Sequence, residues 1–439
     1  MNQPQPQQPS LLTKLVQGAG IALTIQIVSA GVMYASQILL ARWMGVDEYG
    51  LYDYVNAVSI SLGLLAGFGL PSTVLHFIPA YQVQKNWSYL QGIIRGSWLQ
   101  TLVIGLIISG CSTGVWLRLN HVKNFEEYAI PLTVGLWAIP IVALVNLQRE
   151  VIRGFQNIAL AYIPSLILHP VILASMAGIW QFRQQLNSTI TIGFFLLSGG
   201  LILALQWLWF QQNLEDSISQ AKPAYEIARW WSFALPLTLV SGSHIILSQT
   251  DTFMIGTTLN AKQVGIYSAA LKTSAWVPFI LMAVNAIKAP LIASLYAQGD
   301  LRGLQQLVSI ISRWMFYPAL VTAIGLIGFA EPVLQLFGSE FIAAKGALII
   351  LIVGQLVNVG SGSVGYLMMM TGHQNQAARV MLITALINVI LNWMGINFLG
   401  IIGAALATTF SMSLWNVWLY TLVVKKIGVF PSILDTYRS

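Results

Sequence analysis

Residues 248–272 read SQTDTFMIGTTLNAKQVGIYSAALK, which is one apolar segment ending, a short turn, and a second apolar segment beginning. Residues 36–54, SQILLARWMGVDEYGLYDY, repeat this design much earlier in the chain. Both stretches open with Ser-Gln, and a Gly-x-Tyr turn begins at Gly50 in one and at Gly265 in the other. The repeat predicts that the chain contains two copies of one unit.

A third match supports the duplication. Gly154-Phe-Gln-Asn157 corresponds to Gly372-His-Gln-Asn375, and the three matches occur in the same order with offsets of 212, 215 and 218 residues. Two copies in the same orientation are related by an axis along the membrane normal, and their central cavity lies between them.

The composition identifies the broad class of the protein. Of its 439 residues, 56% are hydrophobic and only 8% are charged, and the mean hydropathy is +0.72. A soluble domain carries about 25% charged residues, so we expect a polytopic membrane protein. Cys111 is the only cysteine, which excludes an intramolecular disulfide and a cysteine-based metal cluster. The net charge of +7 fits Lys and Arg on cytoplasmic loops, and we expect no nucleic-acid partner.

Apolar stretches of roughly 20 residues, which are long enough to cross a bilayer, recur along the chain. We expect an all-α protein with about twelve transmembrane helices in two six-helix bundles. The domains would be a disordered tail at 1–15, a first half at 16–211, a linker at 212–229, a second half at 230–424 and a tail at 425–439. The segments lie near 16–40, 51–80, 93–116, 130–150, 158–180, 190–211, 231–256, 264–296, 305–329, 343–371, 378–397 and 400–424.

The distribution of Lys and Arg predicts the orientation in the membrane. With the N-terminus inside, the predicted cytoplasmic side holds about twice as many of these residues as the outer side, as the positive-inside rule requires. Both termini are therefore expected in the cytoplasm. Residues 1–10 are rich in Gln and Pro and do not resemble a signal peptide.

Polar residues within the apolar segments are candidates for a site, because a charge at bilayer depth costs at least ~2.5–3.5 kcal/mol. His244, Ser248 and Asp251 are spaced i, i+4 and i+7, which places them on one helix face. Gln26 and Gln37 belong to a similar uncharged stripe on the first segment. Such stripes either line a hydrated cavity or form hydrogen bonds between packed helices.

Asp251 and Lys272 lie at similar depths on consecutive antiparallel segments, roughly 9–12 Å from the outer surface at 1.5 Å per residue. We expect the two side chains to pair. The pair is either a structural salt bridge or a contact that opens when an anionic substrate or a proton arrives.

Three other residues permit two interpretations each. Lys288 either contacts substrate or extends to the interface, and His76 either lines the cavity or packs through hydrogen bonds. Asp53 is either an interfacial residue or a cation site. Pro278 is expected to bend the eighth segment. In the first half, His76 is the only candidate for a deeply placed cation.

Motifs of enzymes are missing from the sequence. It contains no His/Cys/Glu metal spacing, nucleophile elbow, Walker A motif or dinucleotide fingerprint, so we expect no catalytic residue, cofactor or metal. The predicted outer loops are short, which argues against a membrane glycosyltransferase or polymerase and leaves that class as the weakest alternative.

Several of these stretches resemble a known family. Ala41-Arg-Trp-Met-Gly45 with Tyr49-Gly-Leu-Tyr52, and Asp251-Thr-Phe-Met-Ile-Gly256 in the second half, resemble turns of Wzx-type polysaccharide flippases. Asn388 and Asn392 followed by Gly400-Ile-Ile-Gly-Ala-Ala-Leu-Ala-Thr408 are similar to the last two helices of that family. These flippases belong to the multidrug/oligosaccharidyl-lipid/polysaccharide (MOP) exporter superfamily.

The resemblance implies a V-shaped pair of bundles with alternating access in a bacterial or archaeal plasma membrane. The implied substrate is a sugar or oligosaccharide on a polyprenyl pyrophosphate, with the lipid bilayer and other polysaccharide-assembly proteins as partners. The cationic cavity of the family corresponds to Lys272, with Lys288 and Arg42 as weaker matches. A proton- or sodium-coupled multidrug antiporter of the same superfamily is the alternative, in which Asp53 or Asp251 would couple the ion.

Overall fold

A computed structural model describes residues 11–119, 126–214, 216–279 and 291–431. Every regular element within these ranges is helical. Nine helical segments of the described residues are long and apolar enough to cross a membrane. The predicted class of multi-pass, all-helical membrane protein is therefore confirmed, while the number of twelve segments stays a prediction.

The elements of the first half are α1 (Leu11–Ala66), α2 (Leu70–Val83), α3 (Trp87–Leu119), η1 (Glu126–Tyr128), α4 (Ala129–Gly135), η2 (Leu136–Ala138), α5 (Ile139–Gly154), α6 (Ile158–Ile163), the π-helical η3 (Pro164–Leu168), α7 (His169–Gln181) and α8 (Ser188–Gln212). The linker contains α9 (Asp216–Ser219). The second half contains α10 (Ile227–Thr258), α11 (Ala261–Ser274), α13 (Leu301–Gly328), α14 (Ala330–Gln335), η4 (Ser339–Ala344), α15 (Lys345–Gly360), α16 (Val364–Met370), α17 (Gln374–Leu399) and α18 (Ile401–Ile427).

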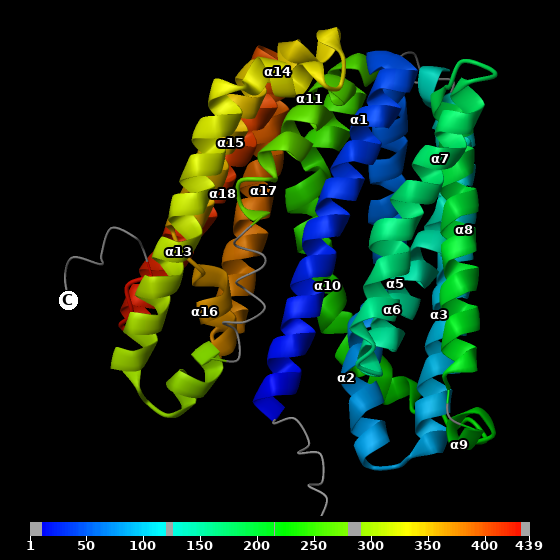
Figure 1. The fold of residues 1–439 in the computed structure, drawn as a ribbon, viewed down its shortest axis with the longest axis vertical. Helices are drawn as coiled ribbons and strands as arrows, with labels where there is room; N and C mark the ends of the chain where they lie inside the picture. The colour runs from blue at the N-terminus through cyan, green and yellow to red at the C-terminus, as the bar shows by residue number, and fades with distance from the viewer. Residues whose placement is uncertain (1–10, 120–125, 215, 280–290, 432–439) are drawn as a thin grey trace, which may run out of the picture.

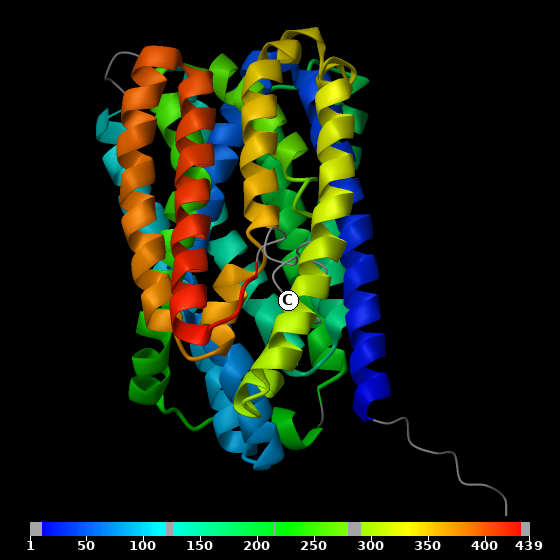
Figure 2. The ribbon, with the colours of Figure 1, turned by 90° about the vertical axis from the view of Figure 1, so that its left-hand side faces the viewer.

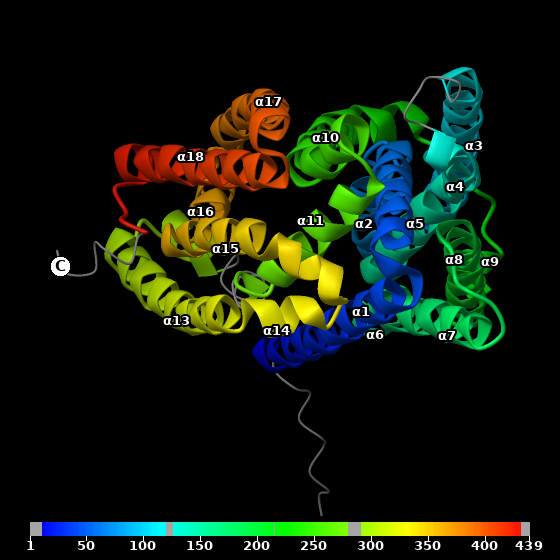
Figure 3. The same ribbon diagram turned by 90° about the horizontal axis from the view of Figure 1, so that it is seen from above.

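The helices form two groups with a shared middle. In Figure 1, α2 to α9 lie on one side, α13 to α18 lie on the other, and α1, α10 and α11 lie between them. The groups converge at the end that holds α14 and separate towards the end that holds α9. Figure 2 shows the long helices of the second half running along the same axis, and Figure 3 shows α1, α10 and α11 at the centre from above. Residues that lie between the groups are therefore on these three helices.

The first two predicted segments are joined by a bend and interrupted at a position that the sequence does not predict. Residues of both segments form α1, which bends at Gly45, where φ is 78° and ψ is 173°. Glycine adopts this conformation without the clash that a Cβ would cause. The second segment, predicted as continuous over 51–80, is interrupted before α2 by positive φ angles at Phe68 and Gly69. In the eighth segment, α11 ends at Ser274 and residues 275–278 form turns, so the α-helix is interrupted before Pro278; the predicted bend at this proline stays a prediction.

The predicted linker lies on the first half. The backbone N–H of Ala224 donates to the carbonyl oxygen of Ser88 in α3 at 3.0 Å. The linker is also shorter than predicted, because α10 begins at Ile227. Near the start of α10, Trp230 and Ala234 are buried in a cluster with residues of α2 and α5. The first turns of α10 are therefore attached to the first half, although the sequence assigns α10 to the second.

Two repeated glycines form the closest approach between the halves. A Cβ on Gly50 would collide with the carbonyl oxygen of Ala261, and one on Gly265 would lie 2.5 Å from the carbonyl oxygen of Val46. Residues 46 and 50 are each 215 positions from 261 and 265, so the contact is reciprocal, as in an interface between two copies related by a two-fold axis. The repeated turn thus packs against its own copy and brings α1 against α11.

Candidate functional site

Lys272 of α11 lies at the contact between the halves and binds only acceptors from α1. Its ammonium group donates to Gln37 Oε1 at 2.9 Å, to the hydroxyl of Tyr49 at 2.8 Å and to Asp53 Oδ1. A lysine has three N–H donors, so these contacts satisfy all of them. Its Nζ also lies 5.0 Å from the centre of the Tyr49 ring, a cation–π distance. We call Gln37, Tyr49, Asp53, Ser268 and Lys272 the interface cluster.

Asp53 is the anionic member of the interface cluster. Besides Lys272, it accepts a 2.5 Å hydrogen bond from Ser268 Oγ to its Oδ2. The side chain of Asp53 is 11% exposed, and that of Lys272 is 27% exposed. The ion pair is therefore mostly shielded from solvent, where removing one partner is costly because the other charge is left uncompensated.

The predicted partners of Lys272 and Asp53 need correction. The expected Asp251–Lys272 pair is wrong, because Lys272 contacts Asp53 of the opposite half. Asp53 is a buried contact residue between the halves, and the interfacial interpretation at the outer surface does not describe it. The repeat offset of 215 contained a signal for this contact, since it relates Asp53 to Ser268, the residue that binds it.

Helix geometry explains why the cluster forms at this position. Tyr49 and Asp53 are one turn apart in α1, and Ser268 and Lys272 are one turn apart in α11, so each pair shares a helix face. Gly50 and Gly265 let the two backbones approach closely at the same level. Sequence reasoning identified Lys272, Asp53 and Gln37 but missed Tyr49 and Ser268, because their hydroxyl groups acquire a role only through this contact.

Asp251 occupies a second site inside the second half. Its Oδ2 accepts hydrogen bonds from Tyr267 at 2.5 Å and from Thr408 at 2.8 Å. Its Oδ1 is buried and has no hydrogen-bond partner among the described residues that meets standard geometry. Asn392 of α17 also has an unpaired buried oxygen, and its amide nitrogen donates to Asn388 at 3.1 Å. These free oxygens, together with Thr408, are the kind of ligands that hard cations prefer.

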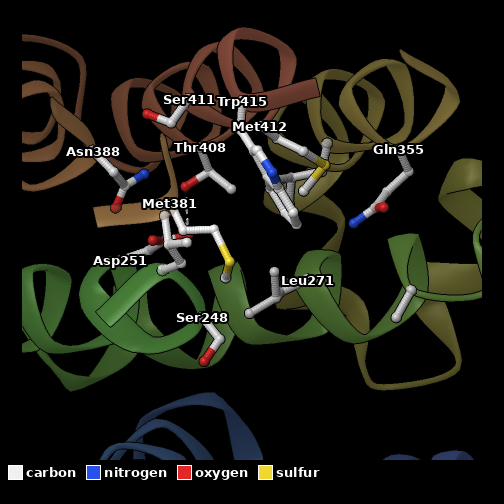
Figure 4. Close-up of a pocket in the computed structure, with 13 residues that line it drawn as sticks. Ser248, Asp251, Leu271, Gln355, Met381, Asn388, Thr408, Ser411, Met412 and Trp415 are labelled. Atoms are coloured by element: carbon white, nitrogen blue, oxygen red, sulfur yellow. Dashed lines mark hydrogen bonds between the residues drawn. The ribbon is translucent and has the colours of Figure 1, made fainter. Parts of the chain in front are cut away.

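A cavity of about 360 Å³ adjoins Asp251 (Figure 4). Helices α10, α11, α15, α17 and α18 form its walls. In Figure 4, Asp251 and Thr408 lie at one side of the cavity and Gln355 at the other. The predicted residue Ser248 also lines it, so two members of the predicted polar stripe border one cavity. The lining residues are Leu247, Ser248, Asp251, Leu271, Ala275, Leu351, Gln355, Met381, Asn388, Thr408, Ser411, Met412 and Trp415.

Of the remaining candidate residues, His76, Arg42 and Gln26 lie outside the interface cluster and do not line the cavity beside Asp251. His76 stacks on Phe233 of α10 with ring centres 4.5 Å apart, Arg42 is exposed near the bend of α1, and Gln26 is half-buried eleven residues before Gln37. Lys288 lies outside the described residues. For His244 the structure describes the backbone within α10 but not the side chain. Among the described residues, no group of three His, Cys, Asp or Glu side chains could hold a metal ion.

Comparison with known proteins identifies the family. The model of the polysaccharide biosynthesis protein family matches residues 15–296, which include the interface cluster and Asp251. The chain belongs to this family. The model of the MatE family matches residues 236–394 in addition. The resemblance to Wzx-type flippases of the MOP superfamily is therefore confirmed.

Individual relatives agree with membership of the polysaccharide biosynthesis protein family. The chain is 24% identical over 399 residues to the probable low-salt glycan biosynthesis flippase Agl15 of Haloferax volcanii, covering 88% of this chain and 79% of that protein. It is 28% identical over 401 residues to the probable flippase AglR of the same organism, covering 90% and 73%. The inward-facing conformation of a multidrug resistance MATE family transporter of the MOP superfamily superimposes with a TM-score of 0.76 at 15% identity, covering 93% of this chain and 98% of that one. This likeness shows a shared fold.

Proposed function

We propose that this protein is a flippase for a polyprenyl-pyrophosphate-linked sugar or oligosaccharide. It moves the substrate from the cytoplasmic to the outer leaflet by alternating access, for surface polysaccharide biosynthesis, and it catalyses no chemical reaction. Membership of the polysaccharide biosynthesis protein family and the two similar flippases support this function.

The proposed mechanism rests on the contacts within the interface cluster. Lys272 is a partly exposed cation that belongs to one half, while its acceptors Tyr49 and Asp53 belong to the other. A diphosphate offers oxygen acceptors of higher charge than a single carboxylate. When it binds Lys272, it replaces the acceptors on α1 and weakens the contact between α1 and α11. A ligand shifts a conformational equilibrium only if it binds one state more tightly. The diphosphate would bind Lys272 more tightly in the state in which α1 no longer occupies its ammonium group.

The architecture of the proposal is two six-helix halves, at 16–211 and 230–424, in a cytoplasmic membrane. The reciprocal contact of Gly50 and Gly265 supports a pseudo-two-fold axis between the halves. Both termini would be cytoplasmic, which places the end with α14 outside and makes the described conformation closed on the outer side (Figure 1). The bilayer carries the polyprenyl chain while the diphosphate and sugar cross between the halves. Other polysaccharide-assembly membrane proteins would supply and remove the substrate.

Asp251 is the proposed coupling residue for a proton or a sodium ion. Its Oδ1 has no hydrogen-bond partner of standard geometry among the described residues, and Asp251 lines the cavity, which supports this role. Asp53 is less suited to this role, because both of its oxygens already accept hydrogen bonds. The same features favour the second candidate function, a cation-coupled multidrug antiporter, which also agrees with the MatE match. In that case Asp251 would be essential and Lys272 dispensable.

Deletion of the gene in its host tests the function directly. We expect lipid-linked oligosaccharide to accumulate on the cytoplasmic leaflet, and we expect wild type but not Lys272→Ala to relieve it. A normal distribution of lipid-linked oligosaccharide, together with altered sensitivity to amphipathic cations, would contradict the flippase and support the antiporter. Sugar transfer by the pure protein in vitro would contradict both and indicate an enzyme.

A further inference from the structure

A second cluster of charge lies on α5, in the first half. Glu150 joins two arginines: its Oε1 accepts from Arg149 Nε at 3.3 Å, and its Oε2 accepts from Arg153 Nη1 at 2.5 Å. Asn146 Oδ1 accepts a further hydrogen bond from Arg149 Nη2. One carboxylate thus holds two guanidinium groups, and the three charged side chains retain a net positive charge.

Arg149 and Arg153 lie on a face of α5 that is near α1 and α6. Val142, Asn146, Arg149 and Arg153 are spaced by three or four residues and share one face of α5. On this face, Val142 adjoins Gly63 of α1, and the guanidinium of Arg153 lies 5.5 Å from the ring centre of Tyr162 in α6. Figures 1 and 3 show α5 and α6 beside α1, the helix that borders the second half.

The side chain of Glu150 is more deeply buried than those of the two arginines. The side chain of Glu150 is 10% exposed, whereas those of Arg149 and Arg153 are 26% and 35% exposed. Each guanidinium has five N–H donors, and the hydrogen bonds with Glu150 and Asn146 use only a minority of them. A mostly buried carboxylate therefore holds two partly exposed arginines that retain unused donors, which suits them to bind an oxyanion.

We propose that Arg149 and Arg153 bind the diphosphate group of the substrate on the first half of the protein, with Glu150 holding both guanidinium groups in position. The proposal rests on the proposed function. Two arginines one turn apart present parallel donors to two linked phosphoryl groups, and Glu150 fixes their orientation before the ligand arrives, which limits the entropic cost of binding. With a cytoplasmic N-terminus, the fourth predicted segment, near 130–150, ends on the cytoplasmic side. Both arginines lie at that end, which is the side on which the proposed substrate is loaded.

Binding of farnesyl pyrophosphate to the purified full-length protein in phosphatidylcholine nanodiscs tests the site. The test variant is Arg149→Gln, Glu150→Gln and Arg153→Gln together, which removes both cations without leaving a buried carboxylate unpaired. Glu150→Gln alone keeps both arginines but removes the carboxylate that positions them, so it tests the positioning role separately. Lys425→Ala removes one exposed cation from the last turn of α18. It causes the same net loss of one positive charge as the triple variant and therefore controls for net charge.

We expect the triple variant to bind farnesyl pyrophosphate at least about tenfold more weakly than wild type. Glu150→Gln should bind with an affinity between those two, and the charge control Lys425→Ala should stay within about threefold of wild type. Inorganic pyrophosphate should compete with the lipid on wild type, and farnesyl monophosphate should bind more weakly than the diphosphate. Equal binding by the triple variant and wild type would overturn the site and leave the flippase intact. Equal affinity for monophosphate and diphosphate would identify a general phosphate site and also overturn the proposal.

If the protein is not a flippase for this substrate, the binding experiment gives a different result. In that case wild type would bind neither farnesyl pyrophosphate nor a sugar-linked polyprenyl pyrophosphate, and the site and the function would both be contradicted. Loss of folding in the triple variant would appear in its thermal unfolding and gel filtration. Arg149→Lys with Arg153→Lys then decides, because lysine keeps the charge but cannot form the paired contacts of a guanidinium; its affinity should be reduced, and wild-type affinity would overturn the proposal.

Discussion

Asp53 of α1 accepts a 2.5 Å hydrogen bond from Ser268 of α11, and the two residues occupy equivalent positions in the repeat, 215 residues apart. One copy thus has a carboxylate where the other has a hydroxyl group. This difference between the two copies makes a symmetric contact chemically asymmetric, because Asp53 can also bind a cation. Lys272, one turn beyond Ser268, supplies that cation. The sequence repeat predicts such a contact between two copies of one unit, and the difference between Asp53 and Ser268 gives it its charge.

Exchanging the charged residues at positions 53 and 272 tests whether Lys272 only stabilises the protein or also binds the substrate. Asp53→Asn and Lys272→Met each leave one mostly buried charge without its partner, and we expect each to lower the stability by about 2 kcal/mol, less than for a fully buried pair because Lys272 is partly exposed. Asp53→Lys with Lys272→Asp restores the ion pair. We expect this double variant to recover thermal stability but not flipping, because the cation moves to the opposite half. Flipping at the wild-type rate would show that Lys272 does not contact substrate.

Gly265→Ala should separate the halves at the repeated turn. The new Cβ would lie 2.5 Å from the carbonyl oxygen of Val46, and this overlap should cost about 1–3 kcal/mol in the described conformation. Spin labels on Asp47→Cys and Ser339→Cys, in a Cys111→Ser background, should report a longer distance in the variant.

Gly110→Ala is the control for this substitution. Gly110 lies within α3 and a Cβ there meets nothing within 4 Å, so alanine should be neutral or should stabilise the helix by up to about 1 kcal/mol. The same label distance in Gly265→Ala as in Gly110→Ala would refute a tight contact between α1 and α11.

Asp251 should make flipping depend on a cation gradient. We expect Asp251→Asn to abolish the stimulation of flipping by an imposed sodium or proton gradient in proteoliposomes. Thr408→Val should shift the cation concentration for half-maximal flipping by about tenfold, because the carboxylate loses one hydrogen bond.

Two substitutions serve as controls for Thr408→Val. Thr408→Ser keeps the hydroxyl group and should behave like wild type. Thr421→Val makes the same chemical change on an exposed turn of α18 and should have no effect. An unchanged gradient dependence in Asp251→Asn would exclude this aspartate as the coupling residue.

Glu331 should contribute a small pH-dependent term to stability. The hydrogen bond from Lys345 at 2.7 Å, and then its positive charge, lower the pKa of Glu331 below its usual range. A carboxyl group whose pKa is lower in the folded state stabilises that state above its unfolded pKa, and this contribution is lost as the pH falls through its folded pKa. Wild type should melt slightly above Glu331→Gln at pH 7, and the two curves should merge in acid. A difference that grows on acidification would contradict the assignment.

The sequence by itself determined the class of the protein and the repeated turn motif, and it predicted part of the candidate site. A composition with 8% charge cannot cover a water-facing surface, and helical periodicity placed Ser248 and Asp251 on one face, which the cavity confirms. The family was visible in the turns around Gly45 and Gly256. These properties depend on neighbours in the chain or on summed composition, so they are readable without a structure.

Only the tertiary structure decided which charges pair. Asp251 and Lys272 are 21 residues apart and lie at similar depths, yet Lys272 binds Asp53, which is 219 residues away. Local spacing fixes the depth and face of a side chain but not the neighbour that this face meets. That neighbour depends on the close approach of Gly50 and Gly265 and on the cost of leaving a charge unpaired in a low-dielectric contact. The same holds for Arg149 and Arg153, which the sequence marks as cytoplasmic cations and only the folded chain joins through Glu150.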